Sequence, residues 1–381
     1  MDLREDFKQE IVSILKNLVQ IPSENPPGIT KNIVKYLISD VFKEEEGFRN
    51  QIVINKKNGI TLHNLISTIG NGDKTITLSG HFDVVPIGDA SQWKILPFSA
   101  QIKDGRLYGR GSADMKGGIA FLIGAIKILS KIPEFLKKYK LMFLGTADEE
   151  VGMTGSITLS KQEVMKDSIL LIIAEPTNLK IGVGEKGLLW VKLKITGKAA
   201  HGSMPQVGIN AIERALEIIP QLRDFLGDRN NDILGNSTLN IGKISGGTAI
   251  NIIPDQVILD LDYRLIPEQD QKLLIKNLNN LQKSELLPIN MEILKELPAL
   301  MTDSNHLFIQ NIKEISKNEI VGLSYATDAA HFIKSKNPIP FVIYGPGDPR
   351  NIHKTDEYIE IEQIFKAIEH LTTALLRTYL K

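Results

Sequence analysis

Along the first half of the chain, apolar residues recur with the period of a β-strand in some segments and with the period of an α-helix in others. The pattern predicts strands at residues 51–57, 64–70, 75–85, 139–150 and 168–176, and helices at residues 1–23 and 116–132. Residues 169–174, ILLIIA, are apolar without interruption, which is typical of a strand that helices cover on both faces. This order of elements predicts an α/β domain with a mainly parallel sheet flanked by helices.

The pattern changes near Gly187, where residues 188–197 begin to alternate as a half-exposed strand does. A helix at 208–226, strands at 237–247 and 256–266, a helix at 268–282 and a strand at 289–297 complete a βαββαβ order. The α/β signals resume after Pro298. We therefore expect a ferredoxin-like α+β domain inserted into the α/β domain, with segments 1–185, 186–297 and 298–381.

Composition narrows the possible chemistry. Lysine plus arginine and aspartate plus glutamate number 45 each, and this balance argues against a general nucleic-acid or membrane-surface binder. The chain has no cysteine, so a metal site would use histidine and carboxylate ligands. The N-terminus lacks the features of a secretory signal, and no apolar run approaches the length that spans a bilayer. A cytoplasmic enzyme or binding protein is the expectation.

Several chemically capable side chains follow predicted strands. His81 and Asp83 end the strand at 75–85 and, two residues apart, point the same way. The others are Asp114, Glu149, Glu150, Glu175 and His353. Each has an ordinary alternative, such as a solvated turn, a helix N-cap or a strand-end charge. Ligands of open α/β sheets bind beyond the carboxyl ends of the strands, so we expect these side chains to converge there.

Such a set of histidines and carboxylates suits two divalent ions, with zinc preferred and cobalt as the alternative. If Asp114 bridges, one ion takes His81, Asp114 and Glu175, and the other takes Asp114, Glu150 and His353. Asp83 would then accept the ring N–H of His81 and fix its tautomer. Glu149 would act as the general base that takes a proton from water.

The ordered motifs GHFDVVP, GRGSADMKGG, TADEEVGMTGS, AEPT, KAAHGSMP and GPGDPRNIHKTDEY resemble those of the M20 family of metallopeptidases and deacylases. The resemblance spans about residues 10 to 375 and is closest to the branch of succinyl-diaminopimelate desuccinylase and acetylornithine deacetylase. It implies the same two-metal site, with Glu149 as base, and a cis peptide bond between Asp114 and Met115. It also implies that the inserted domain is a lid through which the chain forms a homodimer.

The resemblance further assigns residues of the inserted domain. It implies that His201 of a partner subunit stabilises the oxyanion, and that Asn251 and Arg264 bind the carboxylate or carbonyl end of the substrate. A surface cation is the alternative for Arg264. The remaining histidines, His63, His306, His331 and His370, are expected to be structural or exposed.

Two segments depart from the best-known desuccinylase pattern. Glu185 and Lys186 stand where many bacterial desuccinylases have paired arginines, and SYATDAAHF at 324–332 differs from the usual run. We therefore expect hydrolysis of an N-acyl amino acid, with N-succinyl-diaminopimelate first, acetylornithine or another N-acyl amino acid second, and a dipeptide or carboxypeptidase substrate third. A non-catalytic binding protein on the same scaffold is the alternative from a different class.

Overall fold

A computed structural model describes residues 3–284, 288–333 and 338–380. The chain divides into two compact units. Unit 1 comprises Met1–Val183, Thr302–Val321 and Thr327–Lys381, and unit 2 comprises Gly184–Met301 and Gly322–Ala326. The divisions after Val183 and Met301 lie close to the expected divisions after residues 185 and 297, and the short segment 322–326 was not expected in unit 2.

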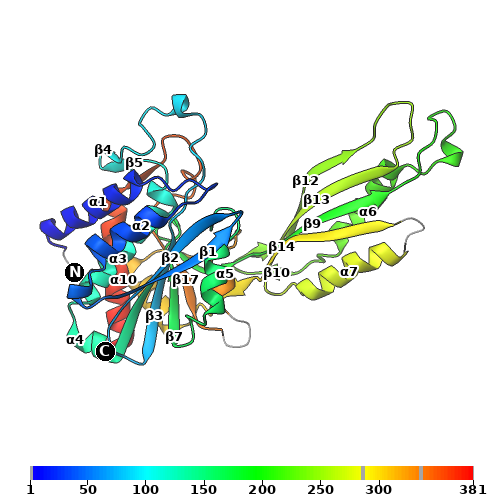
Figure 1. The fold of residues 1–381 in the computed structure, drawn as a ribbon. Helices are drawn as coiled ribbons and strands as arrows, with labels where there is room; N and C mark the ends of the chain where they lie inside the picture. The colour runs from blue at the N-terminus through cyan, green and yellow to red at the C-terminus, as the bar shows by residue number, and fades with distance from the viewer. Residues whose placement is uncertain (1–2, 285–287, 334–337, 381) are drawn as a thin grey trace. The chain divides into compact units, whose positions relative to one another are not determined.

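The large sheet, which lies mainly in unit 1, has a parallel centre, as the apolar strands predicted (Figure 1). Its order is β1-β2-β6-β3-β7-β17-β8-β15, with β16 paired to β8. Strands β6, β3, β7 and β17 are parallel to one another, and the strands at both edges are antiparallel. The bounds are β1 Arg49–Lys57, β2 Ile60–Ile69, β3 Lys74–His81, β6 Tyr139–Thr146, β7 Ser168–Ile173, β8 Ile181–Glu185, β15 Leu300–Met301, β16 Ile320–Leu323 and β17 Phe341–Ile343.

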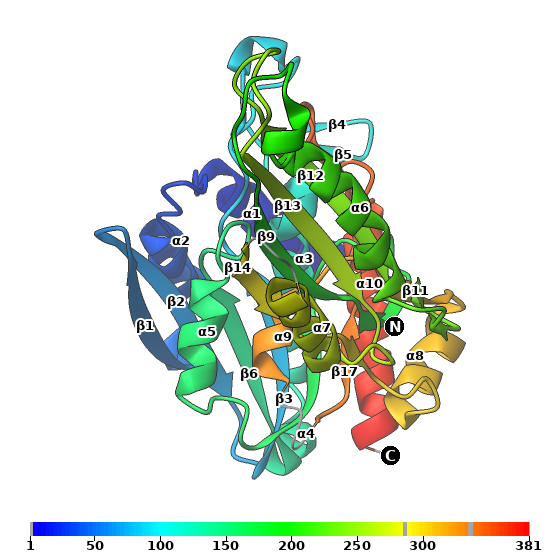
Figure 2. The ribbon, with the colours of Figure 1, turned by 90° about the vertical axis from the view of Figure 1, so that its right-hand side faces the viewer.

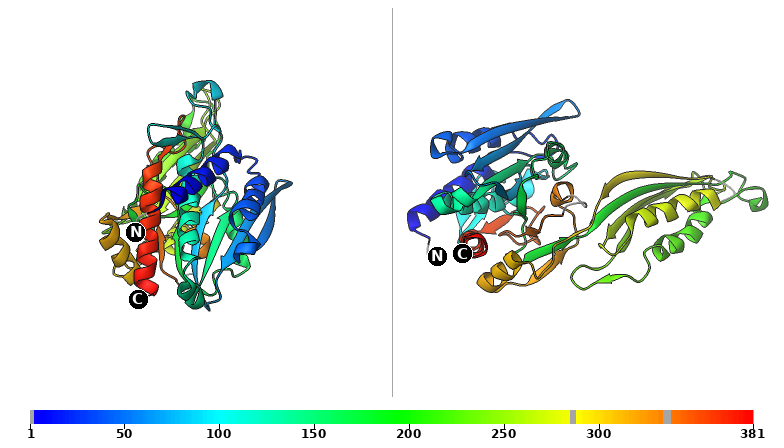
Figure 3. Two further views of the ribbon diagram at one scale, coloured as in Figure 1. Left: turned by 90° about the vertical axis from the view of Figure 1, so that its left-hand side faces the viewer. Right: turned by 90° about the horizontal axis from the view of Figure 1, so that it is seen from below.

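Helix α3 of unit 1 packs closely against both α1 and α10 (Figure 3). Gly124 of α3 makes this possible, because a Cβ there would lie 2.4 Å from Ile368 of α10 and 3.4 Å from Ile11 of α1. No helix in the described ranges is long and apolar enough to cross a membrane. The helices of unit 1 are α1 Glu5–Gln20, α2 Lys31–Tyr36, α3 Gly117–Leu129, α4 Pro133–Lys138, α5 Thr154–Lys161, α8 Leu307–Ser316, α9 Ala329–Phe332 and α10 Ile361–Tyr379, with shorter turns η1 Leu37–Val41, η2 Glu44–Glu46, η3 Ala90–Gln92 and η4 Ser112–Lys116.

A small antiparallel sheet in unit 1 was not predicted from the sequence. It has the order β18-β5-β4, with bounds Tyr358–Glu360, Arg106–Tyr108 and Gln101–Lys103. Each strand has only three residues, too few for a hydrophobic period to be recognised. This sheet brings the segment after His353 against the segment before Asp114.

Unit 2 has the predicted βαββαβ order. Its four-stranded sheet is antiparallel throughout, with the order β12-β13-β9-β14. Buried side chains of β9, β13, α6 and α7 share one apolar core, so both helices cover the same face of the sheet (Figure 2). The bounds are β9 Gly187–Thr196, α6 Ala211–Asp224, β12 Thr238–Gly246, β13 Gln256–Leu265, α7 Gln271–Ser284 and β14 Ile289–Leu297, with a turn η5 Pro205–Val207 and a short hairpin of β10 Asn230–Asn231 and β11 Gly235–Asn236.

Candidate metal centre

The end of β3 places a histidine and a carboxylate on one side of the chain and an aromatic ring on the other. His81 and Asp83 are 1 % and 0 % exposed, and Phe82 between them is fully buried. The Phe82 ring occupies the space beside Gly145 of β6, where a Cβ would lie 1.8 Å from the ring. The packing of Phe82 on one side of the chain keeps the side chains of His81 and Asp83 on the other side.

Neighbouring strands bring three acidic residues to the same edge of the sheet. His81 of β3 is paired with Thr146 of β6, a few residues before Glu149 and Glu150. On the other side, Ser79 of β3 is paired with the last residue of β7, two residues before Glu175. Helix α3 approaches this edge so closely that a Cβ at Gly118 would lie 2.0 Å from the carbonyl of Ala174.

The expected ligands meet around Asp114. His81 Nε2 lies 3.1 Å from Asp114 Oδ1 and 3.8 Å from Glu175 Oε1. His353 Nε2 lies 3.1 Å from Asp114 Oδ2 and 3.2 Å from Glu150 Oε2. Ligand atoms of His81, Asp114 and Glu150 all lie within 4.8 Å of one another. One carboxylate oxygen of Asp114 therefore faces each histidine, which is the arrangement that a bridging ligand requires. The peptide bond between Asp114 and Met115 is cis, as the resemblance implied.

The contact between His81 and Asp83 differs from the expected one. His81 Nδ1 lies 2.9 Å from the backbone oxygen of Asp83, whereas the nearest carboxylate oxygen is 3.9 Å away. A carbonyl oxygen only accepts hydrogen bonds, so Nδ1 carries the proton and Nε2 faces Asp114 and Glu175. The tautomer is thus fixed by the main chain, and the expectation that the Asp83 carboxylate does this is corrected.

The Asp83 carboxylate instead holds the segment that carries Glu149 and Glu150. It accepts the backbone N–H groups of Glu149 at 3.1 Å and of Glu150 at 3.2 Å. The amide of Asn25 donates to Asp83 Oδ2 at 2.8 Å and to Asp148 Oδ1 at 2.9 Å. Three donors thus tie the Asp83 carboxylate to Asn25 and to the segment of Glu149 and Glu150 rather than to the ring of His81.

The side chains of the cluster have strongly shifted pKa values. Burial, and the neighbouring carboxylate of Glu175, raise the pKa of Glu149 well above its usual value. Burial likewise raises the pKa of Glu175, with Asp114 adding to it. Asp114 and Glu150 raise the pKa of His353 to about 10. Two divalent cations would balance the four carboxylates of Asp114, Glu149, Glu150 and Glu175 and leave both histidines neutral, so the donor set fits two such ions.

The remaining candidate residues lie in unit 2. The backbone of His201 forms a bridge with Ile252, and the carbonyl of Asn251 accepts the N–H of Gly202, so these two predicted residues are neighbours. His201 is exposed, and its Nδ1 lies 2.8 Å from Ser203 Oγ. Arg264 on β13 forms an ion pair with Asp262 on the same strand, with Nε 2.9 Å from Oδ1.

Four buried polar residues around the cluster were missed from the sequence. Asp328 accepts the hydroxyl of Thr146 at 2.6 Å, and Asn25, Arg110 and Glu357 hold the loops that carry the ligands. Arg110 and Glu357 stand inside recognised motifs, but their contact spans 247 positions of sequence. Of the remaining histidines, His306 caps α8, and His370 Nδ1 lies 2.7 Å from the Tyr344 hydroxyl oxygen.

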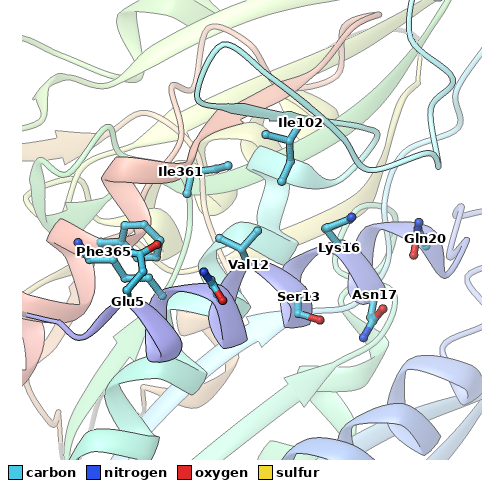
Figure 4. Close-up of a pocket in the computed structure, with 11 residues that line it drawn as sticks. Glu5, Val12, Ser13, Lys16, Asn17, Gln20, Ile102, Ile361 and Phe365 are labelled. Carbon is cyan, nitrogen blue, oxygen red and sulfur yellow. The ribbon is translucent and has the colours of Figure 1, made fainter.

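A separate pocket of unit 1 runs along α1 and contains none of these residues (Figure 4). Val12, Ile102, Ile361 and Phe365 give it an apolar side, and Lys16 lies along its edge. It brings together no cluster of histidines and carboxylates, so the candidate site remains the cluster around Asp114.

Comparison with known proteins gives a consistent result along the whole chain. Residues 77–377 match the model of peptidase family M20/M25/M40. A probable succinyl-diaminopimelate desuccinylase of Staphylococcus aureus is 29 % identical over an alignment of 409 positions, gaps included, which covers 98 % of each chain. An acetylornithine deacetylase of Pasteurella multocida is 34 % identical over 333 residues, which cover 84 % of each chain.

Solved structures share the fold. Aminopeptidase PepT of Bacillus cereus superposes with a TM-score of 0.79 at 23 % identity, covering 98 % of this chain and 99 % of that one. The YXEP protein of Bacillus subtilis, described as a dinuclear metal-binding peptidase, superposes with a TM-score of 0.68 at 18 % identity, covering 98 % and 100 %.

Proposed function

The chain belongs to peptidase family M20/M25/M40, and from this premise we propose that it hydrolyses the amide bond of an N-acyl amino acid with the help of two divalent ions. The observation that supports this most is the convergence of two histidines on the two oxygens of Asp114, with Glu150 and Glu175 beside them. As in the sequence-based assignment, Asp114 would bridge the two ions. His81 with Glu175 would complete one ligand set, and Glu150 with His353 the other.

Zinc suits these ligands, and cobalt is the alternative. When bound, two such ions lower the pKa of water and polarise a carbonyl group. The chain's own part begins with Asp83, whose carboxylate fixes the backbone of Glu149 and Glu150. Glu149 has no ligand role in this assignment, so its carboxylate is free to take a proton from the attacking water and pass it to the departing amine.

The residues of unit 2 would bind and stabilise the substrate. His201 would donate a hydrogen bond to the oxyanion, while Asn251 and Arg264 would hold the carboxylate or carbonyl end of the substrate. The Arg264 guanidinium suits a carboxylate because it can make two parallel hydrogen bonds, for which it would leave Asp262. Losing a hydrogen-bond donor to the oxyanion raises the activation free energy by roughly 3 kcal/mol.

We infer that His201 acts in the site of a partner subunit and that the chain is a homodimer through unit 2. Apolar side chains near the His201 loop are unusually exposed, which supports a protein contact there: Met204 at 47 %, Val207 at 51 % and Ile250 fully exposed. Mixing Glu149→Gln subunits with His201→Ala subunits tests this. A heterodimer contains one site with both native residues, so activity should return in part. Demonstrated subunit exchange without recovery would exclude the shared site.

N-succinyl-diaminopimelate is the proposed substrate, because several relatives that match nearly the full length bear the name of its desuccinylase. N-acetylornithine is the second candidate, because a deacetylase of that substrate is 34 % identical. Activity in the cytoplasm is part of the same proposal. The test is to load purified protein with zinc or cobalt and offer a panel of N-succinyl, N-acetyl and dipeptide substrates, with ninhydrin detection of the freed amine. Substrate binding without hydrolysis anywhere in the panel would favour the non-catalytic alternative.

A further inference from the structure

A buried arginine connects three loops of the candidate metal centre. Arg110 is 3 % exposed, and its Nη1 donates to Glu357 Oε2 at 2.6 Å and to the carbonyl of Lys354 at 3.1 Å. Its Nη2 donates to the carbonyl of Pro86 at 3.4 Å, and its guanidinium lies 5.1 Å from the centre of the Trp93 ring. The arginine thereby contacts the loop that follows His81, the loop that follows His353 and its own loop, which leads to Asp114.

Glu357 completes the connection with three acceptors. It is 1 % exposed, and its Oε1 accepts the backbone N–H groups of Ala113 at 3.0 Å and of Asp114 at 3.2 Å. Its Oε2 accepts the arginine, and its carbonyl oxygen accepts the N–H of Gly109 at 2.9 Å. Glu357 follows His353 by only four residues. It therefore bonds to the main chain of Asp114 and also belongs to the loop that carries His353.

We propose that the Arg110–Glu357 pair is a positioning clamp, which holds Asp114 and His353 at the separation that two shared metal ions require. The proposal rests on the two-metal function above. Neither side chain is among the ligands, so the clamp acts on metal affinity through the main chain of Asp114 and the loop of His353. Groups that orient metal ligands in this way commonly change metal affinity by about 10–100-fold when they are removed.

The clamp requires a carboxylate at position 357. Both oxygens of Glu357 face donors, namely two backbone N–H groups on one side and the guanidinium of Arg110 on the other. A glutamine of the same shape has one acceptor and one donor, so either orientation sets an NH₂ group against existing donors. Glu357→Gln should therefore damage the site although the volume of the side chain is unchanged.

The chain offers a matched control a few residues away. Arg106 and Glu360 join β5 to β18 by an ion pair, with Nη2 3.1 Å from Oε1, but both side chains are about half exposed and neither bonds to the main chain of a candidate ligand. Glu357→Gln, Glu360→Gln, Arg110→Lys and the double variant Arg110→Met/Glu357→Gln should be compared with the parent protein. Zinc affinity is measured without substrate by competition with a chromogenic chelator. Hydrogen exchange of the Ala113 and Asp114 amides is measured in metal-free protein.

The clamp predicts that Glu357→Gln weakens zinc binding about 10-fold or more and accelerates exchange at the two amides, while Glu360→Gln changes neither. The double variant should bind zinc more tightly than Glu357→Gln alone, because removing the guanidinium lets the amide oxygen turn to the backbone donors. Zinc affinity and exchange of Glu357→Gln equal to those of the parent, or an equal loss in Glu360→Gln, would overturn the clamp.

A second variant keeps the proposal testable if Glu357→Gln does not fold. Arg110→Lys retains the charge but cannot reach the Pro86 and Lys354 carbonyls with one ammonium group, so its zinc affinity should also fall. A folded Arg110→Lys protein with parental zinc affinity would then refute the clamp. Failure of the parent protein itself to bind zinc or cobalt would refute the two-metal function instead, which separates the two outcomes.

Discussion

Replacing Asp83 should both destabilise unit 1 and release the segment that carries Glu149. The carboxylate is fully buried and accepts the N–H groups of Glu149 and Glu150 and the amide of Asn25. Hydrogen bonds to a charged group contribute roughly 1.5–3 kcal/mol each. Asp83→Ala leaves these three donors without their acceptor. Since water can enter the space, we take the lower value for each bond and expect a loss of about 4.5 kcal/mol in the free energy of unfolding.

Asp83→Asn separates metal binding from the position of Glu149. Its single acceptor oxygen can keep the bonds to Glu150 and Asn25 that now end on Oδ2, while its NH₂ group opposes the N–H of Glu149. We expect a loss of about 2 kcal/mol and a fall in kcat, with metal content retained because the Glu150 backbone stays bound.

The assay is urea unfolding in excess chelator, so that metal binding contributes nothing to the transition. The chain has two tryptophans, so a Trp190→Phe background leaves Trp93 of unit 1 as the only fluorescent indole. Exposed Asp89, which accepts the N–H of Ser91, provides the control, and Asp89→Asn should leave the transition unchanged. An Asp83→Ala protein that unfolds at the parental urea concentration would refute the role given to this carboxylate.

Other substitutions separate the roles of the remaining residues. Glu149→Gln should keep its metal and lose about 10²–10⁴-fold in kcat; loss of metal, measured by elemental analysis, would mean that Glu149 is a ligand. His201→Ala should lower kcat with little change in KM, whereas Arg264→Ala should chiefly raise KM, and steady-state kinetics that show the reverse would exchange their roles. Burial raises the pKa of Asp328 to about 6 from 3.8. In metal-free protein, the folded state is therefore stabilised while this group is protonated, and this stabilisation is lost as the pH rises through 6. Asp328→Asn should therefore be more stable than the parent by about 3 kcal/mol at pH 7.5, with a gain that shrinks below pH 6 in urea unfolding; a gain independent of pH would contradict the assignment.

The sequence predicted the parallel strands and the cluster at their ends for one physical reason. Strands β3, β6 and β7 are almost wholly buried, and β6 and β7 have mainly apolar residues, so the charged residues that follow them stand out in the sequence. Side chains placed there, such as His81 and Glu175, must meet because the strands are parallel neighbours. The βαββαβ order of unit 2 was predictable because its strands alternate and its helices have one apolar side.

The buried polar contacts could not be predicted in the same way. Asp83 contacts Asn25 across 58 positions, and Arg110 contacts Glu357 across 247, without any period that connects them. A charged residue inside a motif has the same appearance in sequence whether it binds a metal, a substrate or the main chain of a loop. The predicted hydrogen-bond partner of the His81 ring was wrong for a related reason. A backbone carbonyl is present at every position, so nothing in the sequence indicates which one accepts a hydrogen bond.

Removal and return of metal test the central claim most directly. Protein purified with its metal should be dialysed against a chelator, shown to be folded by circular dichroism, and assayed for release of amine from its best N-acyl amino acid substrate. The account predicts that activity disappears, and that it returns as zinc or cobalt is added until about two ions per chain are bound. Full activity in the metal-free, folded protein would contradict the account.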